Sequence, residues 1–381
     1  MGDTLNERVQ RIIDAYDHKK PDHTPALAMV GTWAIANAGG TVKEMEENPI
    51  LEKEYYLKTF DTLYCDAVMT GGIVNDAKSF ELIGSGAAFA SNDGTSIQHK
   101  ENIVMGDDEY PKLIAEPYEF VVNEILPRKA EKLRGDFADN YEAMSACVQH
   151  RLKKAEVQKK LVKELRDRDI PVFNGAVLSP PLDMIFDFLR GFRGLAVDLR
   201  RRPELVEEAC DKLMMYSEAM LGYDPTVESY PAFPIFGTMA HSPNFIRPKQ
   251  FEQLWWKYYL KLAKPIWEKG GRTCIYCEGT WTDKLDIIQD VPKNQAAFHI
   301  APDGMYQAKE KLGDNSVIVG GMAMNELRFK SKEECLDLAK KYIEDFGADG
   351  GYIFTIDREL VCPNDVNTEN LEAVYEFVHN Y

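Results

Sequence analysis

The second half of the chain alternates short apolar runs with longer amphipathic segments, and this alternation constrains the fold more than any other feature. The apolar runs predict strands at 233–238, 272–278, 295–300, 316–320 and 351–357, and predicted helices follow them at 248–269, 281–290, 305–312, 331–346 and 368–378. Helical connections of this length are what parallel strands require. The number of repeats therefore predicts an α/β fold, a (β/α)8 TIM-like barrel.

The first half of the chain follows the same pattern less regularly. Helical periodicity is seen at 4–19, 50–64, 142–167 and 200–221, and strand-like runs lie at 26–30, 66–70 and 170–178. Between residues 76 and 130, turns interrupt the pattern, which predicts an inserted or elaborated subdomain. Because no Gly/Ser linker divides the chain, we expect one domain over residues 1–381, a barrel with an N-terminal elaboration.

Charge and composition exclude several classes of partner. The net charge of −17 repels phosphate backbones and anionic lipid surfaces, so we expect no nucleic acid and no membrane partner. No apolar run reaches the roughly 20 residues that a membrane span needs, and the N-terminus lacks the pattern of a signal peptide. The seven cysteines, an odd number spread over a long chain, predict free thiols in the cytoplasm. A monomer and a homodimer both remain open.

Three predicted strands end in a polar side chain on one face. Alternation places Tyr276 and Glu278 on the same side of their strand, and it likewise gives His299 and Asp357 that side of theirs. Chemistry in α/β barrels is kept at the carboxyl ends of the strands. We therefore expect Glu278 and His299 to lie side by side, as zinc ligands, as an acid–base pair, or as a hydrogen-bonded polar pair at the barrel mouth.

Other residues near predicted strand ends extend this site. Asp357 is a candidate third ligand or acid–base group, and Cys362 could reach back from the following loop as a ligand. His241 follows a strand and is a candidate general acid or substrate contact, with a turn or capping role as the alternative. Tyr276 could donate a hydrogen bond to a substrate oxygen.

Two tryptophans and two cysteines complete the candidates. Trp33 and Trp281 lie at predicted strand ends and are candidate residues of the substrate pocket. Cys274 and Cys277 form a C-x-x-C pattern, but on a strand their thiols face opposite sides, which argues against a disulfide switch.

Five short segments together resemble a known family. They are Lys20-Pro21-Asp22-His23-Thr24-Pro25, Arg202-Pro203-Glu204-Leu205-Val206, Arg247-Pro248-Lys249-Gln250-Phe251, Gly350-Gly351-Tyr352-Ile353-Phe354 and Thr368-Glu369-Asn370-Leu371. Their order and spacing resemble the uroporphyrinogen decarboxylase superfamily, whose members are (β/α)8 barrels. The resemblance implies either a cofactor-free decarboxylase or a zinc-dependent methyltransferase that works with a corrinoid.

The residues favour the methyltransferase branch. The stretch 30–37, which matches the arginine-rich loop of the decarboxylases, contains no arginine. Tyr276-Cys277-Glu278-Gly279 aligns with the His-x-Cys-Gly motif of thiol-directed methyltransferases, with Tyr276 and Glu278 in place of the zinc ligands. Glu278 followed by His299 is similar to the Glu…Glu…His pattern of O-demethylating methyltransferases, whose first Glu falls on Ala263.

The resemblance implies a zinc ion held by Glu278, His299 and Cys362. The enzyme would then move a methyl group from a small methoxylated, aromatic compound to the Co(I) corrinoid of a partner protein, because this chain has no Asp-x-His-x-x-Gly corrinoid segment. Three alternatives stay open: a corrinoid-to-carrier methyltransferase acting on a thiol or pterin, a cofactor-free uroporphyrinogen-type decarboxylase, and a barrel that only binds a ligand.

Overall fold

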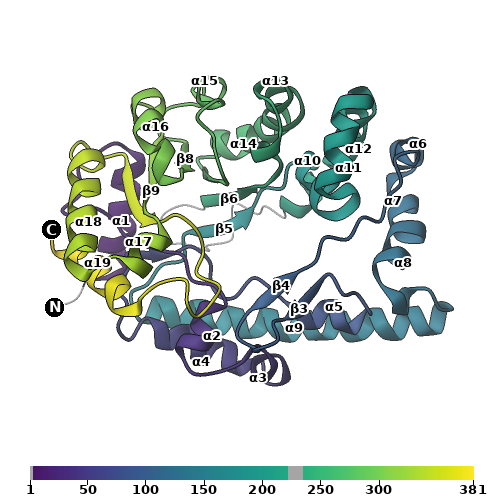
Figure 1. Cartoon of the computed structure of the whole chain (residues 1–381), viewed down its shortest axis with the longest axis horizontal. Helices are drawn as coiled ribbons and strands as arrows, with labels where there is room; N and C mark the ends of the chain where they lie inside the picture. Colours follow the sequence, from purple (N-terminus) through teal and green to yellow (C-terminus); the bar gives the residue numbers. More distant parts are fainter. Residues whose placement is uncertain (1–2, 222–234) are drawn as a thin grey trace.

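The computed structural model describes residues 3–221 and 235–381, in which helices surround a set of parallel strands (Figure 1). The strands of the barrel are β1 (Leu27–Ala28), β2 (Ala67–Val68), β5 (Asn174–Val177), β6 (Ile235–Ala240), β7 (Arg272–Cys277), β8 (Ala296–His299), β9 (Val317–Met322) and β10 (Tyr352–Ile356). Six of them form a parallel sheet in the order β10-β9-β8-β7-β6-β5, and β1 pairs with β2.

Two isolated bridges close this arrangement into a ring. Ala26 pairs in parallel with Phe354 beside β10, and Val68 pairs in parallel with Val172 just before β5. The two-stranded and six-stranded sheets are thereby joined at both edges. The predicted (β/α)8 barrel is confirmed, with β1 and β2 contributing only short stretches of ladder.

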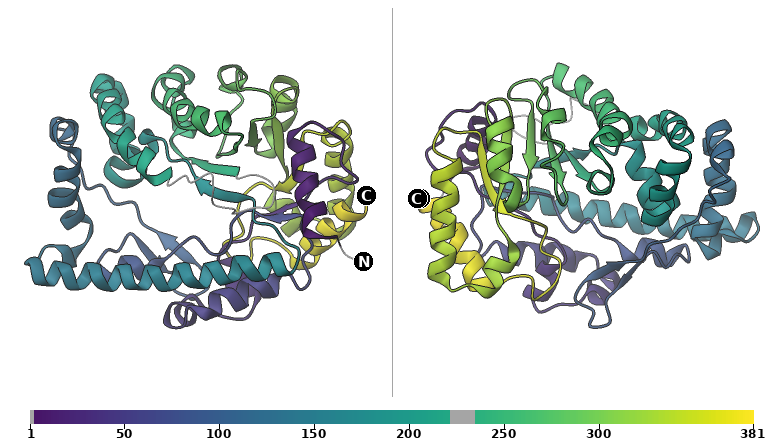
Figure 2. Two further views of the ribbon diagram at one scale, coloured as in Figure 1. Left: turned by 180° about the vertical axis from the view of Figure 1, so that it is seen from behind. Right: turned by 45° about the horizontal axis from the view of Figure 1, so that its top comes forward.

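The interior of the barrel is filled by side chains and plugged by a helix. Helix α1 (Leu5–Tyr16) begins at a capping box formed by Thr4 and Glu7. Its residues Ile12, Ala15 and Tyr16 share one buried cluster with inward side chains of seven strands and with Phe173, which directly precedes β5. The Tyr16 hydroxyl also donates a hydrogen bond to the backbone oxygen of Thr273, 3.0 Å away. This helix therefore covers the end of the barrel at which the strands begin (Figure 2).

Helices surround the ring and connect its strands. After β1 come α2 (Trp33–Asn37), α3 (Val42–Glu47) and α4 (Ile50–Thr59), and α9 (Phe137–Asp167) precedes β5. After β5 come α10 (Pro181–Met184), the π-helical turn η3 (Ile185–Arg190), α11 (Gly191–Arg201) and α12 (Pro203–Leu221), and after β6 come η4 (Ser242–Phe245), α13 (Pro248–Phe251), η5 (Glu252–Trp256) and α14 (Lys257–Glu268). The last strands are followed by α15 (Leu285–Ile288) after β7, η6 (Pro302–Gly304) and α16 (Met305–Leu312) after β8, α17 (Met324–Phe329) and α18 (Lys332–Phe346) after β9, and α19 (Thr368–Asn380) after β10.

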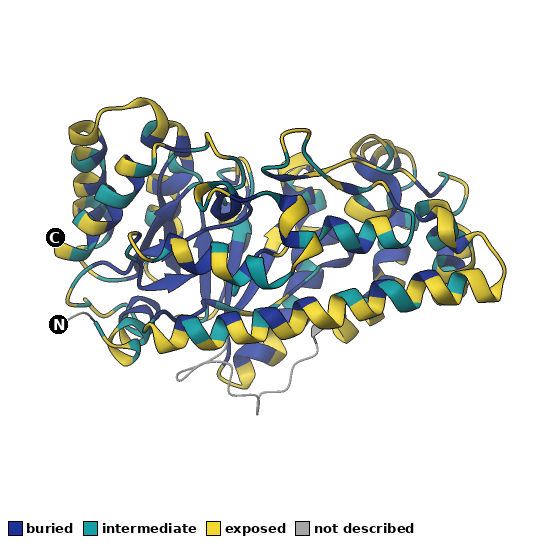
Figure 3. Ribbon diagram, turned by 90° about the horizontal axis from the view of Figure 1, so that it is seen from below, coloured by how far each residue is buried: buried dark blue, intermediate teal, exposed yellow. Residues whose placement is uncertain are grey.

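The segment between β2 and α9 is an elaboration of the repeat. It contains α5 (Ala77–Leu82), an antiparallel hairpin of β3 (Ala88–Ala90) and β4 (Ile97–His99), α6 (Tyr110–Ala115), α7 (Pro117–Phe120), η1 (Val121–Ile125), α8 (Leu126–Lys129) and η2 (Glu131–Leu133). The long helix α9 runs beneath this segment, with buried residues along one side and exposed residues along the other (Figure 3).

Several expected elements differ from the structure in their bounds, including the following two. The helix predicted over 281–290 is reduced to α15, with turns on both sides of it, and the indole of Trp281 donates a hydrogen bond back to the backbone oxygen of Glu278. The strand predicted at 233–238 begins, within the described residues, at Ile235; Phe233 lies outside them. Among residues 3–221 and 235–381, no helix has the length and apolar character needed to cross a bilayer.

Candidate active site at the barrel mouth

The expected alternation of side chains is present in the strands that reach the mouth. Cys274 packs with Ala297 and Ile353 inside the barrel, whereas Cys277 packs in the outer cluster with the helices. Because side chains alternate along a strand, Tyr276, His299 and Thr355 face inward, one step nearer the mouth. The thiols of the C-x-x-C pattern therefore face opposite sides, as the sequence predicted.

Tyr276, and not Glu278, is the neighbour of His299. The register of the β7–β8 ladder pairs Tyr276 with His299, and their ring centroids lie 4.7 Å apart. Glu278 follows two residues after Tyr276 and so extends beyond the end of β8. The prediction that Glu278 and His299 lie side by side is wrong. It assumed that β7 and β8 end at the same level, whereas the register of the ladder pairs His299 with Tyr276.

His299 is held inside the barrel as a neutral imidazole. Its Nε2 atom donates a hydrogen bond to the backbone oxygen of Ile356, 2.9 Å away, which leaves Nδ1 as an acceptor. Nδ1 is buried and has no hydrogen-bond partner among the described residues. Burial lowers the pKa of His299 to about 4. The ring lies beside Tyr276 and therefore one step deeper in the barrel than Glu278.

Glu278 instead meets His241, the residue that directly follows β6. The His241 Nε2 atom lies 3.5 Å from Glu278 Oε1, and the Nδ1 atom lies 3.0 Å from an oxygen of Asp187 in η3. The hydrogen bond to Asp187, supported by the charge of Glu278, raises the pKa of His241 to about 9. Burial raises the pKa of Glu278, and His241 partly offsets that effect. Asp187, His241 and Glu278 thus form a charged triad in which His241 contacts both carboxylates, one with each ring nitrogen.

A buried carboxylate fixes the loop that carries His241. Asp183 of α10 accepts hydrogen bonds from the backbone nitrogen of Ser242, at 2.8 Å, and from the indole nitrogen of Trp255, at 2.7 Å. Its side chain is almost completely buried, and burial raises its pKa to about 6. The residue after His241 is therefore anchored to the same helical segment that carries Asp187.

Asp357 occupies the expected strand end but is engaged elsewhere. Its Oδ1 atom accepts a hydrogen bond from the backbone nitrogen of Met324 at the start of α17, 2.9 Å away, and Arg358 lies 3.1 Å from Oδ2. The Tyr276 hydroxyl donates to the backbone oxygen of Asp357, 3.1 Å away. The Tyr276 hydroxyl was predicted to donate to a substrate oxygen, but its proton is already donated in this hydrogen bond.

The remaining predicted site residues lie outside the triad. The backbone nitrogen of Cys362 donates to Asp365, 2.7 Å away, and burial raises the pKa of the Cys362 thiol. The structure does not gather Glu278, His299 and Cys362 into one group. Trp33 and Trp281 are each only 2% exposed, so neither presents the open ring face that a pocket role requires.

Two acidic residues at the mouth were missed by sequence reasoning. Asp187 lies on a π-helical turn and follows no strand, so no pattern in the sequence marked it. Glu359 follows the end of β10, and its burial raises its pKa to about 7. The strand-end rule that selected Asp357 could have selected Glu359 had the loop been considered further.

The His241–Glu278 pair fits two ligands of a zinc ion. Zinc bound to imidazole nitrogen and carboxylate oxygen in tetrahedral geometry places those two atoms about 3.3–3.5 Å apart. The observed separation of His241 Nε2 and Glu278 Oε1 is 3.5 Å. Asp187 on Nδ1 supplies the outer carboxylate that metal-bound histidines ordinarily have. Within the described residues, these two donors have no third protein ligand beside them.

Comparison with solved structures finds the same fold in a methyltransferase from Methanosarcina mazei. The two proteins share 16% sequence identity and a TM-score of 0.64, over 100% of this chain and 99% of the other. A comparison with curated proteins found no match. The family described as uroporphyrinogen decarboxylase (URO-D) matches residues 117–381, which is well over half of the sequence. The chain therefore belongs to the uroporphyrinogen decarboxylase family.

Proposed function

We propose that this protein is a zinc-dependent methyltransferase that moves a methyl group from a small methoxylated, aromatic substrate to the Co(I) corrinoid of a partner protein. The observation that carries the proposal is the Asp187–His241–Glu278 triad at the carboxyl ends of β6 and β7. Membership in the family and a fold shared with a protein named as a methyltransferase support it.

The three residues have separate roles in this proposal. Asp187 accepts a hydrogen bond from the Nδ1–H group of His241, which fixes the tautomer and directs Nε2 toward Glu278. His241 Nε2 and Glu278 would hold the metal. Bound zinc supplies a Lewis acid that stabilises negative charge on the oxygen that loses the methyl group. A nitrogen-and-oxygen ligand set suits this hard oxygen better than thiolates would.

The charges at the mouth argue against the decarboxylase alternative. A substrate with several carboxylates requires basic side chains, yet the triad contributes two carboxylates and one imidazole. Arg358 is close to this region, but it is paired with Asp357. Met239, on the inward face of β6, leaves 47% of its surface exposed, which offers an apolar contact to a methoxylated ring.

Metal analysis of untagged protein tests the proposal. We expect Glu278→Ala and His241→Ala each to contain one zinc equivalent fewer than the native protein, whereas His99→Ala, a change at an exposed histidine, retains the native content. The same variants should lose the methoxyl-dependent consumption of Co(I) cobalamin, followed by its absorbance. Native zinc content in both mouth variants, or a metal-free native protein that takes up no zinc, would overturn the zinc-dependent mechanism.

A further inference from the structure

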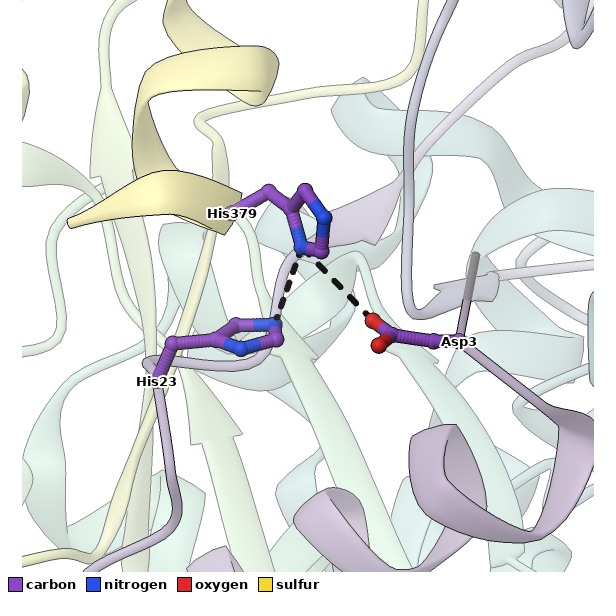
Figure 4. A group of neighbouring side chains, drawn as sticks. All are labelled: Asp3, His23 and His379. Carbon is purple, nitrogen blue, oxygen red and sulfur yellow. Dashed lines mark hydrogen bonds and ion pairs between the residues drawn. The ribbon is translucent and has the colours of Figure 1, made fainter. Parts of the chain in front are cut away.

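A second group of metal-ligating side chains lies away from the mouth, where the first and last helices meet. Asp3 directly precedes the cap of α1, His23 lies in the loop between α1 and β1, and His379 lies in the last turn of α19. Figure 4 shows the three side chains converging from these segments. Since α1 plugs the end at which the strands begin, this group is at the opposite end of the barrel from Glu278.

The distances within the group match the spacing of ligands around one ion. His379 Nδ1 lies 3.5 Å from His23 Nε2 and 3.6 Å from Asp3 Oδ2 (Figure 4). The three ligand atoms all fall within 4.8 Å of one another. Two ligand atoms of a tetrahedral zinc ion lie about 3.3–3.5 Å apart. Within the part of the chain that the structure describes, no other group of three such residues satisfies this criterion.

The contacts among these atoms are too long to be good hydrogen bonds. A strong bond between nitrogen and oxygen measures about 2.9 Å, whereas those that His379 makes to its two neighbours are 3.5 and 3.6 Å. His23 Nε2 is similarly 3.4 Å from the Tyr64 hydroxyl and 3.6 Å from Asp66. Two imidazoles and a carboxylate therefore point at a common place without satisfying one another.

The surroundings hold the rings in place and carry excess negative charge. The ring of Tyr64 stacks on His379, with centroids 3.9 Å apart, and its hydroxyl donates to Asp3, 2.8 Å away. Arg11 contacts three carboxylates, those of Asp3, Asp22 and Asp66. One guanidinium does not neutralise three carboxylates. Asp3 Oδ2 already accepts from Arg11 and Tyr64, so Asp3 would bind a cation through a lone pair of the same carboxylate that these two donors leave free.

We propose that Asp3, His23 and His379 form a second metal site, which takes a divalent first-row transition ion such as Zn²⁺. Two imidazole nitrogens select this class of ion over Ca²⁺ and Mg²⁺, which prefer oxygen ligands. A water molecule would complete the tetrahedron. Because the ligands come from the start of α1, the loop before β1 and the end of α19, the bound ion fastens the plug helix to the last helix of the barrel.

The experiment uses untagged, full-length protein stripped of metal with a chelator, in a Glu278→Ala background that removes the mouth site. Co²⁺ is the probe, because its visible spectrum reports tetrahedral nitrogen and oxygen ligation. We expect one equivalent of Co²⁺ to bind, Zn²⁺ to displace it, and Zn²⁺ to raise the melting temperature. Adding His379→Ala should abolish all three effects, and adding His99→Ala should leave them unchanged.

Two results would overturn the site: no Co²⁺ bound by the Glu278→Ala protein, or full binding by a His379→Ala variant whose circular dichroism is native. Should His379→Ala fail to fold, modification of the native protein with diethyl pyrocarbonate decides the question. Zn²⁺ should protect His379 and not His99, and equal modification with and without Zn²⁺ would reject the site. A protein that binds no zinc at the mouth would still give the expected results in these tests. The proposed second site and the proposed zinc site at the mouth can therefore be rejected independently of each other.

Discussion

The Nδ1 atom of His241 lies 3.0 Å from the carboxylate of Asp187, a residue on a helical turn that sequence patterns did not mark. This contact decides what His241 can do. With Nδ1 donating to Asp187, the Nε2 atom faces Glu278, and the imidazole is stabilised in its protonated form when no metal is bound. The zinc site that we propose for the mouth therefore depends on Asp187, which contacts the ligand His241 and is not itself a ligand.

Replacing Asp187 with asparagine should weaken metal binding without removing a ligand. We expect Asp187→Asn to lower zinc affinity by about 10–100-fold, the effect typical of losing an outer carboxylate behind a ligating histidine. Competition with a chromophoric chelator measures the affinity. Asp290→Asn, a change at an exposed aspartate, is the matched control. Equal affinities in the two variants would show that Asp187 does not support the site.

Glu278 should be essential for methyl transfer and dispensable for folding. Its side chain is 40% exposed at the mouth, so Glu278→Gln should leave the melting temperature nearly unchanged. We expect it to lower the rate of Co(I)-dependent methyl transfer at least about 100-fold, because the stabilisation of charge on the leaving oxygen is lost. Glu310→Gln, at an exposed site on α16, should retain native activity. Loss of activity in both variants would point to a cause away from the mouth.

Zinc binding at the mouth should become tighter as the pH rises. The pKa of His241 is raised to about 9, so below that pH a bound zinc ion must displace a proton from the imidazole. Between pH 6.5 and 8 we expect the dissociation constant to fall by up to about tenfold per pH unit. Titration calorimetry in buffers of different ionisation enthalpy counts the released protons. A dissociation constant independent of pH would mean that His241 is not a ligand.

In the metal-free protein, the same shift gives a stability term of defined sign. The folded-state pKa of His241 lies above the ordinary value of about 6.5, so its contribution is fully present below pH 6.5 and is lost as the pH rises through 9. The His241→Gln variant should not show this decrease in the free energy of unfolding. Chemical denaturation of chelator-treated protein at pH 6.5 and pH 9 compares the two.

His299 should make the protein sensitive to acid. Its pKa is lowered to about 4 by burial, so in the unfolded chain this imidazole binds a proton near pH 6.5, whereas in the native protein it binds one only near pH 4. This group alone should reduce the free energy of unfolding by about 2 kcal/mol between pH 7 and pH 5. His299→Phe, which keeps an aromatic ring beside Tyr276, should flatten that part of the stability profile. An unchanged profile would show that His299 is not the group responsible.

Asp183 is predicted to be a positioning residue for His241. Asp183→Asn replaces one of two accepting oxygens with an amide group that faces a donor, either Ser242 or Trp255. We expect a loss of about 1–3 kcal/mol in the free energy of unfolding. Fluorescence of Trp255 should change with it, and zinc affinity should fall less than in His241→Ala. If zinc affinity and stability are both native, the hydrogen bonds that Asp183 accepts have no functional role.

Much of the barrel could be predicted from sequence because its strands and helices have strong local periods. The alternation of Cys274, Tyr276 and Glu278 was correct, and so was the position of nearly every strand after residue 235. The closure of the barrel by β1 and β2 was harder to predict from the sequence. β1 and β2 form only two ladder pairs with each other, and such short strands carry little pattern.

The composition of the site could be predicted only in part, for a reason of geometry. Glu278 was selected as the last residue of a predicted strand and His241 because it follows one, but their contact depends on where neighbouring strands end relative to one another. The pairing of Tyr276 with His299 is a property of the ladder, and no local pattern encodes it. Asp187 was missed because its role comes from a helical turn that packs over the mouth.

The ring of strands also determines how the chain can be divided. The family match begins at residue 117, so that region contains β5 to β10 and lacks both β1 and β2. A fragment of that extent would leave the free backbone edges of β5 and β10 exposed, each able to pair with another molecule. Such a fragment should aggregate on expression, although it holds every residue of the Asp187–His241–Glu278 triad. Supplying residues 1–116 as a separate polypeptide should restore solubility by completing the ring.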